Sequence, residues 1–470
     1  MQSFIKLIFR LAFLLGTLVA SAQNISGTWK GALNIQGMEL PIVFNISQSG
    51  DGYTTTLDSP KQGAYDLATD KTTFEDNKLT ITYAQIGMEY TATFSDGAFS
   101  GTFSQGGQTF PLDLKKGKKE EKREKEEVKP KPQEPKKPYP YASEEVTFKN
   151  KAANNIKFSG TLTIPANVKN PPVAILITGS GPQDRNEELL GHKPFLVLAD
   201  HLTRKGIAVL RYDDRGTAKS EGDFGTATSF DFADDAEAAM NYLQTRGDVV
   251  DVNKIGFIGH SEGGLIAPII AARNKKVAFC VLLAGPGVDG IEVLLTQGKK
   301  GAELNGTDPR DIEASLPISK KIFEICANYK GENSDKEMKA LFEEMRDKMV
   351  TEASKKELSD IAIDNQIKTL TGPWMRTFLG YDPQTSLVKV DCPVLAVNGE
   401  KDFQVLPKLN LDGIKKGLQH NKDVTIKEFK NLNHLFQTSE TGAFSEYADI
   451  EETFAPVALN FVSDWINARF

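Results

Sequence analysis

One turn of the sequence has the residue types and spacing of a nucleophile. The segment Gly259-His260-Ser261-Glu262-Gly263 contains Gly-x-Ser-x-Gly, between an apolar strand-like run and a helix-like run. In that context the chain must turn sharply, which strains the serine backbone and exposes its hydroxyl. The flanking glycines let strand and helix approach closely. We therefore predict that Ser261 is the nucleophile of an acyl-transfer reaction. The alternative is a tight turn with an idle serine.

A serine hydroxyl is a poor nucleophile at neutral pH and needs a neighbouring base. For a nucleophile on a strand-to-helix turn, the order along the chain is serine, acid, histidine. The chain has five histidines, and only His420 and His434 follow Ser261. His420 ends a predicted helix, whereas His434 follows the last predicted strand, near the sheet edge where ligands bind. We predict His434 as the base.

The acid that orients the histidine should follow the preceding strand. The run Val394-Leu-Ala-Val is followed by Asn-Gly-Glu400-Lys-Asp402. Asp402 lies far enough beyond the turn to reach the histidine, so we predict Asp402 as the acid, with Glu400 as the alternative.

Negative charge on the reacting carbonyl oxygen needs two N–H donors. The backbone N–H of Glu262, directly after the nucleophile, is one predicted donor. The loop Thr178–Arg185 follows the strand Val173–Ile177, and within it we predict Ser180 as the second donor, with Gly181 as the next candidate and a pocket residue. The third glycine of a dinucleotide fingerprint is absent here, so we predict no nucleotide site. No Cys/His spacing indicates zinc, and no metal or organic cofactor is expected.

Charged residues follow two of the predicted strands, namely Asp184, Arg185 and the run Tyr212–Thr217. They are interpreted either as a substrate-facing polar cluster or as a salt-bridged scaffold that braces the loops. We favour the scaffold.

The elements that must position these residues alternate from about residue 144 onward. Apolar runs such as Val173–Ile177 and Lys254–Gly259 are typical of strands buried on both faces. Amphipathic segments separate the strands, and they are Pro194–Lys205, Asp231–Arg246, Leu265–Arg273, Pro407–His420 and Pro456–Arg469. The alternation predicts a mainly parallel sheet with helices on both faces.

A stretch at about 288–390 interrupts the alternation and is too long for a simple connection. It reads as helices, including Asp335–Met349 and Thr351–Ile367, and we predict a helical cap over the active site. Trp374 and Phe378, near its end, are predicted to line the substrate pocket or to belong to the cap core. His260 is also assigned to the pocket.

The N-terminal part differs in character. Residues 1–22 have the basic start, apolar run and small-residue cleavage site of a signal peptide, which predicts a secreted or periplasmic protein. Residues 24–114 alternate polar and apolar, which predicts a small antiparallel barrel or sandwich with a lipocalin-like Gly-Thr-Trp start. A spacer role and a binding role stay open for this module. Residues 115–143 are charged and then proline-rich, and they predict a linker.

Composition excludes several classes of protein. The net charge is −7, and no basic motif indicates a nucleic-acid partner. After signal cleavage no other run is long enough to cross a bilayer. Cys280, Cys326 and Cys392 are odd in number and widely spaced, so we predict buried free thiols, although one bridge is possible.

Residues from about 144 to 470 resemble the α/β-hydrolase superfamily, in particular its bacterial serine aminopeptidase-like and esterase branch. The resemblance rests on five blocks in order, which are Gly179–Arg185, Tyr212–Gly216, Gly259–Gly264, Asn398–Asp402 and Asn433–His434. It implies a serine hydrolase. The aromatic wall expected from Trp374 and Phe378 would suit a small or medium acyl ester, and a peptidase is the alternative. A binding protein on an inactive hydrolase scaffold is the alternative without catalysis. Thr178 departs from the pattern, since many relatives have histidine there.

Overall fold

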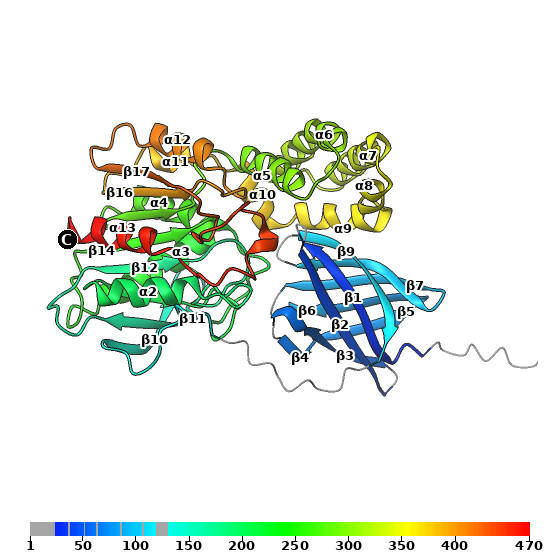
Figure 1. The fold of residues 1–470 in the computed structure, drawn as a ribbon, viewed down its shortest axis with the longest axis horizontal. Helices are drawn as coiled ribbons and strands as arrows, with labels where there is room; N and C mark the ends of the chain where they lie inside the picture. The colour runs from blue at the N-terminus through cyan, green and yellow to red at the C-terminus, as the bar shows by residue number, and fades with distance from the viewer. Residues whose placement is uncertain are drawn as a thin grey trace, which may run out of the picture.

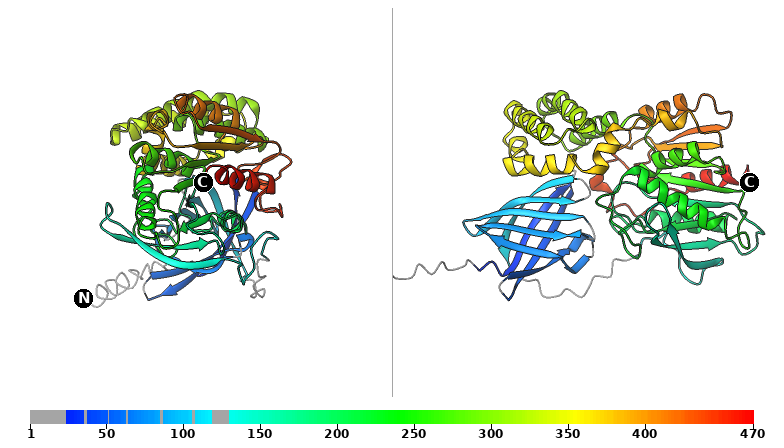
Figure 2. Two further views of the ribbon diagram at one scale, coloured as in Figure 1. Left: turned by 90° about the vertical axis from the view of Figure 1, so that its left-hand side faces the viewer. Right: turned by 180° about the vertical axis from the view of Figure 1, so that it is seen from behind.

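A computed structural model describes residues 24–118, with gaps at 36–37, 51, 63, 85–86 and 106–107, and residues 130–470. The predicted signal peptide, residues 1–22, and the central part of the predicted linker lie outside the described residues. A β-barrel lies beside a larger α/β unit, and a group of helices extends from that unit over the barrel (Figures 1 and 2).

The N-terminal module is a closed antiparallel barrel rather than a sandwich. Its strands run in the order β2-β1-β9-β8-β7-β6-β5-β3-β4, and a pairing of β2 with β3 closes the ring. Alternate side chains point inward, and Trp29, Phe44, Tyr90 and Phe99 are among the largest fully buried ones. Side chains therefore fill the interior, as expected for a small barrel. The strands are β1 (Gly27–Ile35), β2 (Met38–Ser49), β3 (Gly52–Ser59), β4 (Ala64–Ala68), β5 (Lys71–Glu75), β6 (Lys78–Tyr83), β7 (Met88–Ser95), β8 (Ala98–Gln105) and β9 (Gln108–Gly117).

The larger unit is built on an eight-stranded sheet with the order β10-β11-β13-β12-β14-β15-β16-β17. The first two pairings are antiparallel and the other five are parallel. The strands are β10 (Ala142–Asn150), β11 (Ile156–Ile164), β12 (Val173–Ile177), β13 (Ala208–Tyr212), β14 (Ile255–His260), β15 (Cys280–Leu283), β16 (Val394–Gly399) and β17 (Val424–Phe429). Strand β14, which ends just before Ser261, is central.

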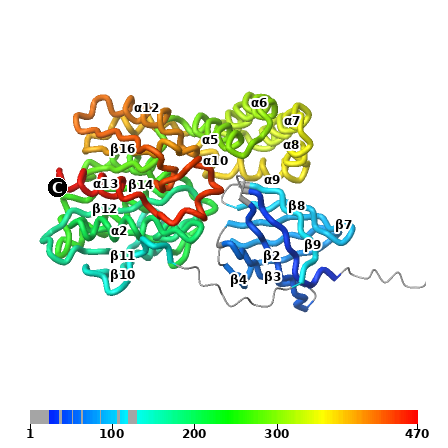
Figure 3. Tube along the Cα trace, in the orientation of Figure 1, coloured from blue at the N-terminus to red at the C-terminus, as the bar shows by residue number. Residues whose placement is uncertain are grey.

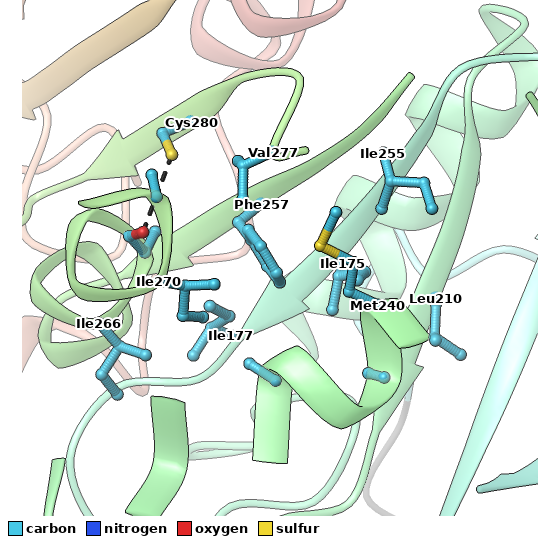
Figure 4. Close-up of a cluster of buried hydrophobic side chains, with 14 of the residues drawn as sticks. Ile175, Ile177, Leu210, Met240, Ile255, Phe257, Ile266, Ile270, Val277 and Cys280 are labelled. Carbon is cyan, nitrogen blue, oxygen red and sulfur yellow. Dashed lines mark hydrogen bonds between the residues drawn. The ribbon is translucent and has the colours of Figure 1, made fainter. Parts of the chain in front are cut away.

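Helices cover both faces of this sheet, which confirms the predicted fold class. Helices α2 (Pro194–Arg204) and α13 (Pro456–Asn467) pack on one face. Helices α3 (Ser229–Leu243), α4 (Glu262–Arg273), α11 (Gln384–Leu387) and α12 (Pro407–Gly417) pack on the other. Side chains of β12 alternate between the two cores, and Figure 4 shows Ile175 and Ile177 with residues of α3 and α4 in one of them. Burial on both faces explains why these strands read as continuous apolar runs.

The predicted cap is helical, but one expected helix is wrong. The helices are α5 (Gly290–Leu304), α6 (Pro309–Ala327), α7 (Glu332–Lys348), α8 (Glu352–Glu357), α9 (Asp360–Leu370) and α10 (Pro373–Gly380). The segment Thr351–Ile367 was expected as a single helix and forms two, α8 and α9. The Ser359 side chain accepts a hydrogen bond from the Ala362 amide, so it caps the start of α9 and breaks the segment.

Helix α9 lies along the outer face of the barrel, as the chain trace shows (Figure 3). The Lys368 ammonium contacts both carboxylate oxygens of Glu89 at 2.7 Å. Asn365 hydrogen-bonds Thr91 and Thr102, which are polar residues of β7 and β8. The barrel thus contacts the cap through polar side chains. Within the described part of the chain, no helix combines the length and hydropathy required to cross a bilayer.

Candidate active site

Ser261 occupies the turn between β14 and α4, with φ +53°. This is the strained conformation that the Gly-x-Ser-x-Gly pattern predicts, because a residue with a Cβ rarely adopts it. The turn also requires its two glycines. A Cβ on Gly259 would lie 1.9 Å from the Gly263 carbonyl oxygen, and a Cβ on Gly263 would lie 2.2 Å from the Ile177 carbonyl oxygen. Strand and helix therefore approach each other as closely as two glycines permit.

Asp402 and His434, predicted from separate loops, meet in the structure. The Nδ1 of His434 donates to Oδ2 of Asp402 at 2.7 Å, and both residues are buried. The other carboxylate oxygen, Oδ1, accepts the backbone amides of Gln404 at 2.8 Å and Val405 at 2.9 Å. Since three donors hold the carboxylate, it fixes the orientation of the imidazole and places the ring proton on Nδ1.

The alternative acid and base lie elsewhere. Glu400 accepts the backbone amide of Asn431 at 2.9 Å. The Nε2 of His420 faces the carbonyl oxygen of Val390 at 3.1 Å. Within the described residues, neither side chain contacts His434. The imidazole of His434 is bonded to Asp402 instead.

The structure brings His434 next to the nucleophile turn through His260, which directly precedes Ser261. The Nε2 of His260 donates to the His434 carbonyl oxygen at 3.0 Å, and the two imidazole centroids are 4.8 Å apart. The hydroxyl of Ser261 forms no hydrogen bond with His434 in this conformation of the described chain. In unliganded sites of this kind, that bond is often long and tightens only when substrate binds.

His260 was assigned to the substrate pocket, but it is buried and both ring nitrogens are bonded. Its Nδ1 contacts the Glu187 carboxylate at 2.9 Å. Both partners of the ring are oxygen acceptors, which fix the imidazole in one orientation between them. Burial lowers the pKa of His260, but the Glu187 carboxylate outweighs burial and the pKa is raised. His260 therefore braces the site rather than presenting a polar group to substrate.

The loop after β12 is held by two carboxylates, of which Asp214 belongs to the predicted scaffold and Glu187 was not assigned from the sequence. Oε1 of Glu187 accepts the Gly179 amide at 2.7 Å. Asp214 accepts the Thr178 hydroxyl and the Gln183 amide. Burial raises the pKa of Asp214, and these hydrogen bonds offset only part of that rise. With the Gly179 amide engaged, the amides of Ser180 and Gly181 are the next donors along the loop, and Ser180 is exposed.

The charged residues after the strands form a scaffold, as favoured from the sequence. Arg185 makes two hydrogen bonds to the Asp213 carboxylate, at 2.9 Å and 2.7 Å, and both side chains are buried. Arg215 pairs with Asp235 of α3 at 2.6 Å. Bidentate pairs of this type fix geometry well. They therefore hold the loops after β12 and β13 in place.

The Glu262 side chain, which sequence reasoning left without a role, is also buried. Its Oε1 accepts the Ser229 hydroxyl at 2.6 Å and the Trp374 indole N–H at 2.7 Å. Burial raises the pKa of Glu262, although these donors and Ser180 act in the opposite direction. Trp374 stacks on Phe378, and Phe378 packs against Leu265 of α4. Phe378 thus belongs to the contact between cap and sheet domain, and Trp374 reaches the residue next to Ser261.

A small polar cavity lies next to the loop after β12, and the first residues of that loop line it. Thr178, Asp214 and Glu262 are among its lining residues, and it has room for about one water molecule. Within the described ranges, no group of three or more His, Cys, Asp or Glu side chains is arranged to hold a metal ion.

This sheet, with a strained serine after β14 and an Asp–His pair in the loops after β16 and β17, has the arrangement of the α/β-hydrolase fold. The family model for serine aminopeptidase S33 matches residues 193–305.

Two curated relatives align with part of the chain. Esterase EstD of Thermotoga maritima is 26% identical over 281 residues, which is 60% of this chain and 58% of that protein. An uncharacterized 31.7 kDa protein of Escherichia coli is 27% identical over 207 residues, which is 43% of this chain and 65% of that protein. The aligned regions thus span less than two thirds of either relative.

Solved structures also resemble part of the chain. The Pyrococcus furiosus esterase Pf2001 covers 70% of this chain and 93% of its own, with 14% identity and a TM-score of 0.43. The α/β hydrolase GrgF from Penicillium covers 70% and 99%, with 18% identity and a TM-score of 0.42.

Proposed function

We propose that the protein is a serine hydrolase that cleaves carboxylic esters of small molecules through an acyl-enzyme intermediate. The observation that carries this proposal is the buried Asp402–His434 pair, bonded at 2.7 Å and tied by His260 to the strained turn of Ser261. A serine with positive φ, a histidine with a fixed tautomer and an acid that orients it are the parts that acyl transfer requires.

In the proposed reaction, the Ser261 hydroxyl attacks the ester carbonyl while His434 Nε2 takes its proton. His434 then returns that proton to the departing alkoxide, which leaves as the alcohol. Water attacks the acyl-enzyme by the same route, with His434 again as base, and releases the carboxylic acid. Asp402 keeps the imidazole oriented and stabilises its charged form.

Two backbone amides are proposed to bind the negative oxygen of the tetrahedral intermediate. The amide of Glu262 is the first of helix α4 and has no acceptor within the helix. The amide of Ser180 follows Gly179, whose own amide is bonded to Glu187. Loss of one such donor typically raises the barrier by about 3–4 kcal/mol.

A peptidase is the second candidate, because the family model that matches residues 193–305 is that of a serine aminopeptidase. The two activities share the proposed triad and differ in the leaving group. Hydrolysis of matched ester and peptide substrates with the same acyl group separates them. We expect the ester to be cleaved faster, and a higher kcat/KM on the peptide would reassign the enzyme.

A fluorophosphonate probe tests the nucleophile itself. Wild-type protein should be labelled once, on the peptide that contains Ser261, and Ser261→Ala should not be labelled. Ser49→Ala is the control, since it removes an exposed serine hydroxyl of the barrel, outside the proposed site. Absence of labelling in folded wild-type protein would instead support a binding protein on an inactive scaffold.

A further inference from the structure

The Glu262 carboxylate lies where three segments of the chain meet. Glu262 starts α4, Ser229 starts α3, and Trp374 belongs to helix α10 of the cap. One oxygen, Oε1, accepts both the Ser229 hydroxyl at 2.6 Å and the Trp374 indole N–H at 2.7 Å. A carboxylate next to a nucleophile is thus hydrogen-bonded to a residue of the cap.

The same carboxyl group adjoins the proposed oxyanion loop. Glu262 lines the same small cavity as Thr178 and Gly179, which are the first residues of that loop. A Cβ on Gly179 would lie 3.2 Å from the Cβ of Ser261, so the loop and the nucleophile turn are in contact. A shift of the Glu262 side chain would therefore reach both the loop and the turn.

Burial makes this arrangement dependent on its donors. Glu262 is 2% exposed, and no cationic side chain is paired with it among the described contacts. A buried carboxylate without a cation relies on hydrogen bonds, and the loss of one donor leaves an unsatisfied charge-bearing group. The indole of Trp374 is the donor that the cap supplies, and it is present only when α10 is seated on the sheet domain.

We propose that Glu262 is a positioning residue that couples the seating of the cap to the geometry of the oxyanion hole. When Trp374 donates to Glu262, the carboxylate is held in place and orients the Ser180 loop beside Ser261. When the cap lifts, the carboxylate loses that donor and the loop loses its support. This inference rests on the proposed function, because it assigns a role to the proposed oxyanion hole.

The test is steady-state kinetics on an ester substrate with Trp374→Phe, Glu262→Gln and the double variant. Phenylalanine keeps a six-membered ring next to Phe378 and removes the N–H together with part of the indole. Trp465→Phe is a matched control, since it removes an indole hydrogen bond of similar length, 2.9 Å to Thr425, remote from the site. We expect Trp374→Phe to lower kcat about tenfold with a smaller change in KM. Trp465→Phe should change kcat less than about twofold.

The double variant separates coupling from two independent defects. If Trp374 acts through Glu262, the double variant should be no slower than the slower single variant. A kcat of Trp374→Phe equal to that of Trp465→Phe, or losses that multiply in the double variant, would overturn the proposal. Fluorophosphonate labelling of wild-type Ser261 distinguishes failure of the coupling proposal from failure of the proposed function. Labelled wild-type protein with unaffected Trp374→Phe refutes the coupling alone, whereas unlabelled wild-type protein refutes the proposed function and the coupling with it.

Discussion

Asp402→Asn is expected to remove most of the activity while the protein stays folded. Oδ1 of Asp402 accepts two backbone amides, at 2.8 Å and 2.9 Å. In the variant, the amide oxygen must stay on that side, because an NH₂ group there would face two N–H donors. The NH₂ group therefore turns to His434 and donates to Nδ1, which becomes an acceptor. The ring proton moves to Nε2, the nitrogen that has to act as the base.

The magnitude follows from this change of tautomer. Where an aspartate that orients a catalytic histidine is replaced by asparagine, kcat falls about 10,000-fold. At 1.36 kcal/mol for each factor of ten, this corresponds to about 5 kcal/mol of activation barrier. The number of hydrogen bonds at the site does not change, so the free energy of unfolding should fall by no more than about 1 kcal/mol.

The assay is hydrolysis of a short-chain nitrophenyl ester together with urea unfolding. Glu400→Gln is the control, because Glu400 is the other acid of the same loop and bonds the Asn431 amide instead. Its kcat should stay within about twofold of wild type. A kcat for Asp402→Asn within tenfold of wild type, or a larger loss in Glu400→Gln, would refute the assignment of the acid.

Three further predictions concern stability and thiol reactivity. Gly259→Ala should strongly destabilise the fold, since its Cβ would lie 1.9 Å from a backbone oxygen. Gly298→Ala, in α5 with nothing within 4 Å, should instead gain about 1 kcal/mol of helix propensity; similar urea midpoints for the two variants would contradict this reasoning. Glu187 raises the pKa of His260, so their pair stabilises the fold below about pH 6.5, and this stability is lost as the pH rises through the raised pKa. Urea unfolding at a series of pH values above about 6.5 should show this decline in the free energy of unfolding for wild type and not for Glu187→Gln. An equal decline with pH in the two proteins would count against the ion pair. Finally, Cys392 should react with iodoacetamide before Cys280, whose sulfur lies 3.9 Å away. Contact with the Cys280 thiol lowers the pKa of Cys392, whereas Cys280 itself is fully buried. Peptide mass analysis measures the order, and earlier modification of Cys280 would contradict this prediction.

Much of the sheet and the Asp–His pair could be predicted from the sequence for one physical reason. Parallel strands buried on both faces are continuous apolar runs, and their carboxyl ends share one edge of the sheet. Residues that directly follow such runs, such as Ser261, Asp402 and His434, are therefore expected at the same edge. The scarcity of histidine after Ser261 left few choices of base.

The contacts of the supporting carboxylates could not be predicted, because their partners are distant in sequence. Glu187 lies in a loop with φ +53° and pairs with a histidine 73 residues away. Glu262 pairs with a tryptophan 112 residues away. The break between α8 and α9 depended on a single capping serine, Ser359, inside an otherwise helical pattern. Local patterns do not encode such pairings, since each is decided by packing between elements.

The candidate site contains groups whose backbone strain or burial destabilises the fold. Such groups are explained by the positions they give to the reacting residues. The positive φ of Ser261 costs about 1–3 kcal/mol. Burial of the Glu262 carboxylate also costs free energy, and its hydrogen bonds offset this cost only in part. Yet the carboxylates of Glu187 and Glu262 join segments that the sheet itself does not connect. Glu187 joins the loop after β12 to the nucleophile turn, and Glu262 joins that turn to α3 and to the cap. The two apolar cores stabilise the fold, and this stability allows the protein to tolerate the buried carboxylates. The carboxylates in turn hold the reacting groups in fixed relative positions.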